Sequence, residues 1–294
     1  MHELLAPGAS LERLATGATW SEGPVWLPDR SSVRWSDIPA DRVLEWSATT
    51  GEMTEYARPA DFTNGRTLDL AGRVVQCSHG RRRVERDVDG IVTGLCDRWQ
   101  GRRLNSPNDV VVASDGAIWF TDPPYGILPG GREGYPAPPE YDGCYVFRLE
   151  ESTGRLDAVI TDMVHPNGLA FSPDERTLYV SDTGHLQIEG APPGIRAYPV
   201  AEGRVGAGRP FVEVRPGASD GIRVDVDGRV WSSSEDSVQV FTPDGQRVLV
   251  IPVPERVGNL CFGGADGRDL FVAASTSLYR IRTTTTDAAA RALG

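Results

Sequence analysis

Lysine is absent from this sequence of 294 residues, in which all 30 basic side chains are arginine. Its absence excludes a catalytic Schiff base, a Ser-Lys dyad and the lysine of a phosphate-binding P-loop. Cysteine is scarce, because only 4 are present and none forms a Cys-x-x-Cys pair. Such sparse cysteines do not suit a disulfide scaffold or a thiolate zinc site. We expect them to be reduced and packed in the core.

Long apolar runs are also absent. No window approaches the roughly eighteen apolar residues of a membrane-spanning helix, and the start of the chain does not resemble a secretory signal. The 41 acidic residues outnumber the basic ones and give a formal net charge of −11. Nucleic-acid binding relies on a basic surface. We therefore expect a soluble, cytoplasmic protein that binds neither membranes nor nucleic acid, with its oligomeric state open.

A repeat runs along the chain. Each copy begins with a polar or acidic residue beside Gly or Asp, continues as an alternating apolar run, turns, and ends in a run that carries an aromatic residue. One clear copy contains IRVDV at 222–226, a turn at Asp227-Gly228 and RVWSSS at 229–234. The residues that open the copies are Glu22, Asn64, Asn108, Asn167, Asp220 and Asn259.

The repeat predicts a fold. Alternating runs joined by Asp-Gly turns indicate strands linked as hairpins, and a period of about 40–50 residues with about four strands is typical of a propeller blade. The last copy offers only three strands, so we expect residues 11–16 to complete it. A short helix is expected near 287–293. The prediction is an all-β, six-bladed β-propeller as one domain over 1–294, with a polar tail at 283–294 and blades starting near 22, 64, 108, 167, 220 and 259.

The openers of the copies should converge on the channel, because the innermost strand of every blade lines it. They are two carboxylates and four amides, with no cation among them. Crowding these oxygens together is costly unless a cation neutralises them. Calcium accepts six to eight oxygen ligands, whereas zinc favours His and Cys. We predict one divalent ion, Ca²⁺ first, with Mg²⁺, Mn²⁺, Zn²⁺ or Fe²⁺ as alternatives; the simpler interpretation is that the openers only form turns.

Other motifs carry less weight. Residues 217–221 match the G-x-S-x-G nucleophile elbow, but an alternating strand follows where the elbow requires a helix. We interpret that match as chance. His79 and His165 could act as bases, although a single histidine more often has a structural role.

Four segments occur in order, at intervals that suit blades: SEGPVW at 21–26, NSPND at 105–109, HPNGLAFSPD at 165–174 and SDG at 219–221. Together they resemble the gluconolactonase/regucalcin (senescence marker protein 30, SGL) family. The resemblance covers about 12–282. It implies a six-bladed propeller with one divalent metal in its channel, and sugar-lactone hydrolysis as the activity of bacterial members.

The resemblance also implies roles for particular residues. The family's metal ligands fall on Glu22, Asn167 and Asp220. Asn108 matches a position that contacts the substrate or the metal. Glu140, in the segment PPEYDGCYVF, is similar to a family residue that touches the sugar lactone from a loop over the site.

The sequence departs from the regucalcin pattern at one point. Where regucalcin-like members carry Arg, this chain has Ser106, which brings it closer to the bacterial gluconolactonase pattern. The segment 123–142 is an insertion rich in Gly and Pro. Such loops often cover bound substrate, and we expect this one at the channel mouth.

These features lead to a hypothesis for the reaction. A divalent ion polarises the lactone carbonyl and activates water, while Asp220 orients or deprotonates that water. Asn108 and Asn105 position ring oxygens, and Asp109 is the second choice as acid or base. The predicted partner is a small-molecule sugar lactone. The alternatives are an organophosphate or aryl-ester hydrolase using the same ion, and a calcium-binding propeller without enzymatic activity.

Overall fold

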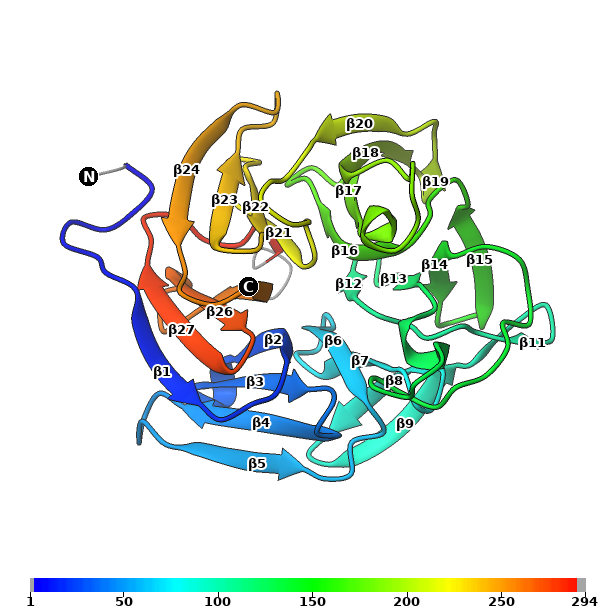
Figure 1. Ribbon diagram of the computed structural model, residues 1–294, viewed down its shortest axis with the longest axis horizontal. Helices are drawn as coiled ribbons and strands as arrows, with labels where there is room; N and C mark the ends of the chain where they lie inside the picture. Colours follow the sequence, from blue (N-terminus) through cyan, green and yellow to red (C-terminus); the bar gives the residue numbers. More distant parts are fainter. Residues whose placement is uncertain (1–2, 290–294) are drawn as a thin grey trace.

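The computed structural model describes residues 3–289. Its strands form six antiparallel sheets of four or five strands, set as blades around a central channel (Figure 1). The predicted all-β, six-bladed propeller is therefore confirmed. Among the described residues, no helix is long and apolar enough to cross a membrane.

The first three blades contain, from the channel outward, β2 (Ser21–Leu27), β3 (Ser32–Asp37), β4 (Arg42–Ser47) and β5 (Met53–Ala57); β6 (Thr63–Leu68), β7 (Val74–Ser78), β8 (Arg83–Val88) and β9 (Ile91–Cys96); β12 (Val110–Val112), β13 (Ile118–Asp122), β14 (Tyr145–Glu150) and β15 (Arg155–Ile160). The next two contain β16 (Pro166–Phe171), β17 (Thr177–Asp182), β18 (Gly194–Ala201), β19 (Arg204–Val205) and β20 (Arg209–Val212); β21 (Ile222–Val224), β22 (Val230–Ser233), β23 (Ser237–Phe241) and β24 (Arg247–Pro252). The sixth contains β25 (Val257–Gly263), β26 (Asp269–Ala274), β27 (Ser277–Arg282) and β1 (Glu12–Thr16).

Short elements connect the blades. A small hairpin lies between the second and third blades and consists of β10 (Arg98–Trp99) and β11 (Arg102–Arg103). The 3-10 helices are η1 (Pro28–Arg30), η2 (Tyr125–Ile127) and η3 (Gly184–Leu186). Of these, η2 and η3 belong to loops that shape the channel mouth, as described below.

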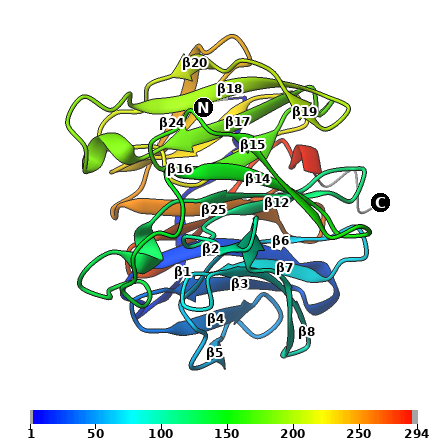
Figure 2. The ribbon, with the colours of Figure 1, turned by 90° about the vertical axis from the view of Figure 1, so that its right-hand side faces the viewer.

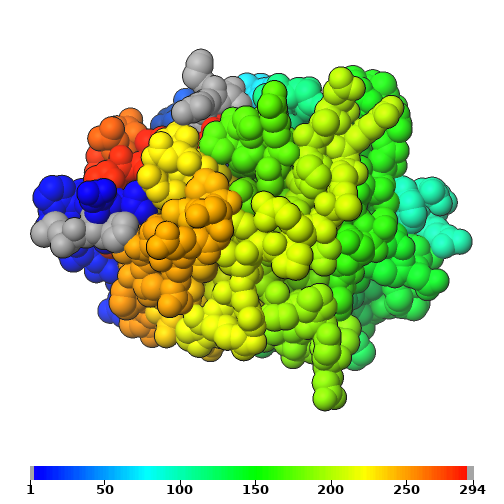
Figure 3. Space-filling model, turned by 90° about the horizontal axis from the view of Figure 1, so that it is seen from above, coloured from blue at the N-terminus to red at the C-terminus, as the bar shows by residue number. Residues whose placement is uncertain are grey.

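The N-terminal strand closes the ring. β1 pairs antiparallel with β27, with Thr16 opposite Ser277. Glu12 and Arg280 form an ion pair across this edge, with 2.7 Å between Oε2 and Nη2. Figure 3 shows the N-terminal residues, in blue, against the orange and red last blade. The expected closure by residues 11–16 is confirmed.

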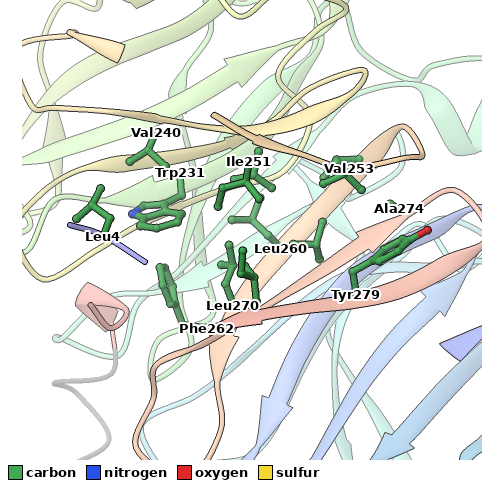
Figure 4. Close-up of a cluster of buried hydrophobic side chains, with 14 residues drawn as sticks. Leu4, Trp231, Val240, Ile251, Val253, Leu260, Phe262, Leu270, Ala274 and Tyr279 are labelled. Atoms are coloured by element: carbon green, nitrogen blue, oxygen red, sulfur yellow. The ribbon is translucent and has the colours of Figure 1, made fainter. Parts of the chain in front are cut away.

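The core is divided among the interfaces between neighbouring blades. Each interface holds a cluster of buried apolar side chains, supplied by alternate residues of the strands on either side. In the cluster between the fifth and sixth blades, Trp231 packs beside Leu260, Phe262 and Leu270 (Figure 4). Full burial of one such side chain contributes roughly 1.5–3 kcal/mol, so the blades hold one another in a fixed ring.

Glycines beside the openers let the inner strands approach one another closely. Gly168 N donates to Asp220 O of the next blade at 3.0 Å, and Gly65 N donates to Asn108 O at 2.8 Å. A Cβ on Gly168 would lie 2.8 Å from the backbone of Gly221, which is too close for any real contact. The pairing of opener and glycine in the repeat is therefore a packing requirement, and it fixes where the opener side chains point.

The described part of the predicted polar tail packs against the fifth blade. Val226 N donates to Thr286 O at 3.0 Å, and Asp287 forms a bridge with Asp225. In Figure 2 this red segment lies on the face opposite the green loop that carries η2. The short helix expected near 287–293 falls mainly on 290–294, outside the described residues.

Candidate active site in the channel

A cavity of about 310 Å³ lies at the end of the channel where the inner strands begin. All six blades or their loops contribute to its wall. Five of the six openers line it, which confirms that they converge. The lining residues are Trp20, Glu22, Ile38, Asn64, Asn108, Tyr125, Arg132, Glu133, Asn167, Thr183, Leu186, Gln187, Asp220 and Arg256.

Two of the openers are carboxylates that repel each other. The Glu22 side chain is buried, and burial together with the charges of Asp220 and Asp109 raises its pKa well above the usual range. Burial also raises the pKa of Asp220 to about 7, although the nearby Arg256 opposes this rise. Both acids therefore resist ionisation in the bare cavity, and a cation placed between them would relieve the repulsion.

The donor set suits a hard cation. Within residues 3–289, no three His, Cys, Asp or Glu side chains come together as a metal-binding group, so the asparagine oxygens would have to complete the shell. Asn167 donates through Nδ2 to Thr183 Oγ1 at 3.3 Å, which leaves its carbonyl oxygen available as a ligand. Two carboxylates with amide oxygens match calcium or magnesium better than zinc. Glu22, Asn108, Asn167 and Asp220 are the residues that could hold the ion.

Asp109 and the sixth opener, Asn259, lie beneath this cavity and do not line it. Asp109 is buried, and its Oδ1 accepts a hydrogen bond from Val110 N at 2.9 Å. Its Oδ2 is 3.4 Å from Asn259 Nδ2 and 3.7 Å from Arg223 Nη1. Both oxygens are thus engaged away from the cavity, and the structure does not place Asp109 where an acid or base would reach a ligand.

The two other residues expected to bind substrate also lie outside the cavity lining. Asn105 Nδ2 donates to the backbone oxygens of Asp122 and Gly143 at 3.2 and 3.1 Å, which makes Asn105 a brace for the loop. Glu140 is exposed and accepts from Arg103 N at 2.8 Å. The structure therefore does not bring these two residues to the ligand.

Glu133 is the carboxylate that the insertion does bring into the cavity. Burial raises its pKa, while the guanidinium groups of Arg132 and Arg256 lower it. Glu133 in turn contributes to the raised pKa values of Glu22 and Asp220. The cavity thus contains three carboxylates and two guanidinium groups.

A buried histidine fixes this loop. His79 Nδ1 lies 3.0 Å from Glu133 O, and its Nε2 lies 3.3 Å from Asn64 Nδ2. A carbonyl oxygen only accepts, so Nδ1 carries the proton and Nε2 accepts from Asn64. Burial lowers the pKa of His79 to about 4, which keeps the ring neutral. His79 therefore orients Asn64 and Glu133, and it does not line the cavity itself.

Ser106 ties down the start of the insertion. Its Oγ donates to Pro123 O at 2.6 Å and accepts from Gly126 N at 2.9 Å. A Cβ on Gly126 would lie 2.8 Å from the Ser106 Cβ. The insertion packs directly against the fully buried Ser106, so a larger side chain at this position would displace the loop.

Sequence reasoning missed the lining residues that come from loops. Ile38 follows β3, Thr183 follows β17, and Arg256 lies between β24 and β25. These connections share the end of the propeller where the inner strands begin. Topology alone would have selected this set of loops, because alternate connections in antiparallel blades reach the same face.

The fold and the cavity define a six-bladed propeller whose channel contains a small cavity lined by acids and amides. The chain belongs to the SMP-30/gluconolactonase/LRE-like region family, whose model matches residues 20–276. It is 32% identical over 308 residues to a gluconolactonase of Zymomonas mobilis, covering 96% of this chain and 83% of the relative. It is 30% identical to a pentonolactonase of Haloferax volcanii, covering 87% and 82%. A gluconolactonase structure from Xanthomonas campestris aligns with a TM-score of 0.89 and 41% identity over 96% of this chain and 91% of that one. The predicted family is confirmed.

Proposed function

We propose that the chain hydrolyses a sugar lactone to its aldonic acid in the channel cavity, using a divalent cation held by Glu22, Asn167 and Asp220. Its relatives named gluconolactonase and pentonolactonase make it a lactonase-type enzyme. The observation that carries the proposal is the meeting of two mutually repelling carboxylates, the buried Glu22 and the half-buried Asp220, with amide side chains in one small cavity.

The cation is the proposed electrophile. When bound, it supplies polarisation of the lactone carbonyl and a lower pKa for the attacking water. Calcium suits the oxygen set best, and Asn108 is available as a further ligand from the third blade. In the protein without substrate, the ion would neutralise the charges of Glu22 and Asp220.

Asp220 is the proposed proton acceptor. During hydrolysis the water oxygen bonds to the carbonyl carbon, the bond from that carbon to the ring oxygen breaks, and the proton from water is passed to the ring oxygen. Asp220 lines the cavity, whereas Asp109 is engaged by Asn259 and Arg223. Asp220 is therefore preferred over Asp109 for moving this proton.

Glu133, Asn64 and Asn108 are the proposed contacts to the sugar hydroxyl groups. All three line the cavity, and His79 holds the first two in place. Carboxylates and amides together offer acceptors and donors to a polyol. Glu133 takes the role that the family resemblance had suggested for Glu140.

The test is hydrolysis of glucono-1,5-lactone by protein stripped with a chelator, with Ca²⁺, Mg²⁺, Mn²⁺ and Zn²⁺ restored one at a time. The rate of acid release in a pH-stat should fall to the uncatalysed rate without an ion and recover with at least one of them. Asp220→Asn should retain below a few per cent of the rate, whereas Glu140→Gln serves as the matched control outside the cavity. Full activity after stripping would refute the cation. If the protein hydrolysed an aryl ester or a fluorophosphate but no lactone, the proposed substrate class would be wrong.

A further inference from the structure

The charges in the cavity are segregated by depth. The Glu22 side chain belongs to the buried inner part, with only 3% of the residue exposed. Arg132 is exposed, and 38% of the Arg256 side chain is exposed. The cavity therefore has an acidic inner part with Glu22 and a basic outer part in which two arginines accompany the carboxylate of the half-buried Glu133.

The two arginines come from unrelated parts of the chain and meet at the same place. Arg132 belongs to the insertion between β13 and β14, and Arg256 belongs to the loop between β24 and β25. Both guanidinium groups act on the Glu133 carboxyl and lower its pKa. Both arginines line the same cavity as Glu133, so a ligand in this cavity meets both guanidinium groups.

Arg256 is held in position, whereas Arg132 is available. The Arg256 guanidinium lies 5.3 Å from the ring centroid of Trp20, and its Nε is 3.4 Å from Glu235 Oε2. Arg132 forms no ion pair within 4.0 Å in the described part of the chain. One arginine is thus preorganised by an aromatic ring and a carboxylate, and the other retains its donors for an incoming group.

A neutral sugar lactone gives no reason for two guanidinium groups at this position. Arginine is the side chain that best recognises carboxylate, sulfonate and phosphate groups, because its planar donors pair with two oxygens at once. The cavity is at the small end of the range for ligand sites, roughly 300 Å³, which suits one monosaccharide with a substituent.

We propose that the substrate is a sugar lactone with an anionic group on the carbon furthest from the ring carbonyl, and that Arg132 and Arg256 bind this group. The proposal rests on the lactonase function proposed above. The shared chemistry is the anion: a phosphate, a sulfonate or the second carboxylate of an aldaric acid. The ring carbonyl then faces the acidic inner part, and the anion faces the basic outer part.

The rival explanation is that the arginines only offset the charge of Glu133 and Asp220. In that case Arg132→Gln and Arg256→Gln would affect neutral and anionic ligands equally. If they bind the anion, the loss is confined to the charged ligand and is weakened by salt, since exposed charges are screened. The ratio between the two ligands separates these explanations.

The experiment compares kcat/KM for glucono-1,5-lactone, its 6-phosphate and glucaro-1,4-lactone on the wild-type protein, Arg132→Gln, Arg256→Gln and the control Arg209→Gln on the outer strand β20. The wild type should prefer an anionic lactone by about tenfold or more, and each cavity variant should reduce this preference by about tenfold. Arg209→Gln should leave the ratio unchanged. The anionic lactone with the highest kcat/KM identifies which anionic group the two arginines recognise.

A binding measurement keeps this proposal separate from the proposed function. Titration calorimetry with 6-phosphogluconate and gluconate, both hydrolysis products, needs no turnover. Tighter binding of the phosphate, lost in Arg132→Gln, would support the arginine site even if no lactone were hydrolysed. Equal binding of the two acids, together with no preference between the lactones, would overturn the proposal while leaving lactone hydrolysis intact.

Discussion

Adding one methyl group at Gly168 should damage a site that Gly168 does not line. In Gly168→Ala the new Cβ would lie 2.8 Å from Gly221 Cα and 2.8 Å from Ile222 N, with Asp220 O closer still. These contacts are backbone atoms of the neighbouring blade, which cannot rotate away as a side chain would. The inner strands β16 and β21 must therefore separate.

The magnitude follows from two losses. Overpacking of this kind costs about 1–3 kcal/mol, and weakening the 3.0 Å hydrogen bond from Gly168 N to Asp220 O adds about 0.5–1.5 kcal/mol. We expect a loss of about 2–4 kcal/mol in the free energy of unfolding, out of roughly 5–15 kcal/mol for a typical domain. A shift of about 1 Å in Asp220 should also lower kcat on the order of a hundredfold.

Urea unfolding followed by tryptophan fluorescence gives the stability, and lactone hydrolysis gives the rate. The matched control is Gly94→Ala on β9, where the Cβ meets only the tip of the Arg83 side chain, at 3.2 Å from Nη1. This control should be neutral or stabilised by about 0.4–1 kcal/mol. Equal stability and equal activity of the two variants would refute the view that opener glycines set the spacing of the site.

Two further predictions concern single acids. Since the pKa of Asp220 is raised to about 7 from near 3.9 in an unfolded chain, native cation-free protein keeps a proton that the unfolded chain has lost. The free energy of unfolding of the cation-free protein should therefore fall as pH rises from about 4 to 7, by at most about 4 kcal/mol. Urea titrations at pH 5, 6.5 and 8 should show a smaller dependence on pH for Asp220→Asn. An unchanged dependence would contradict the raised pKa of Asp220. Glu133→Gln should lower kcat/KM for glucono-1,5-lactone about tenfold or more, whereas Glu140→Gln should stay within about twofold; the reverse order would restore Glu140 to the site.

The repeat made much of the site predictable. The openers were recognisable because each stands before a strand whose alternation is visible in the sequence, as in Asp220 before IRVDV. Strand topology then forces residues from different blades together, and five openers do share one cavity. The closing strand was predictable for the same reason, since a blade of three strands leaves an edge unpaired.

The loop residues were not predictable in this way. The insertion contains two glutamates, and nothing in their sequence context tells which one enters the cavity. Glu133 is selected by a backbone contact to His79 that links residues 54 apart, and Glu140 is directed outward by Arg103. The sequence likewise suggests that Asp109 faces the channel, but in the structure its Oδ2 contacts Asn259 and Arg223. These outcomes depend on contacts between distant segments, which carry no local signal.

The seam between β1 and β27 has a consequence for how the ring is assembled during synthesis. Glu12 and Arg280 are 268 residues apart, so β1 leaves the ribosome long before its partner strand β27. Until then the nascent chain carries an open edge at both ends of an incomplete ring, and neighbouring nascent chains could exchange their first strands. A delay before β27 is translated should therefore promote strand-swapped dimers more than misfolding within any one blade.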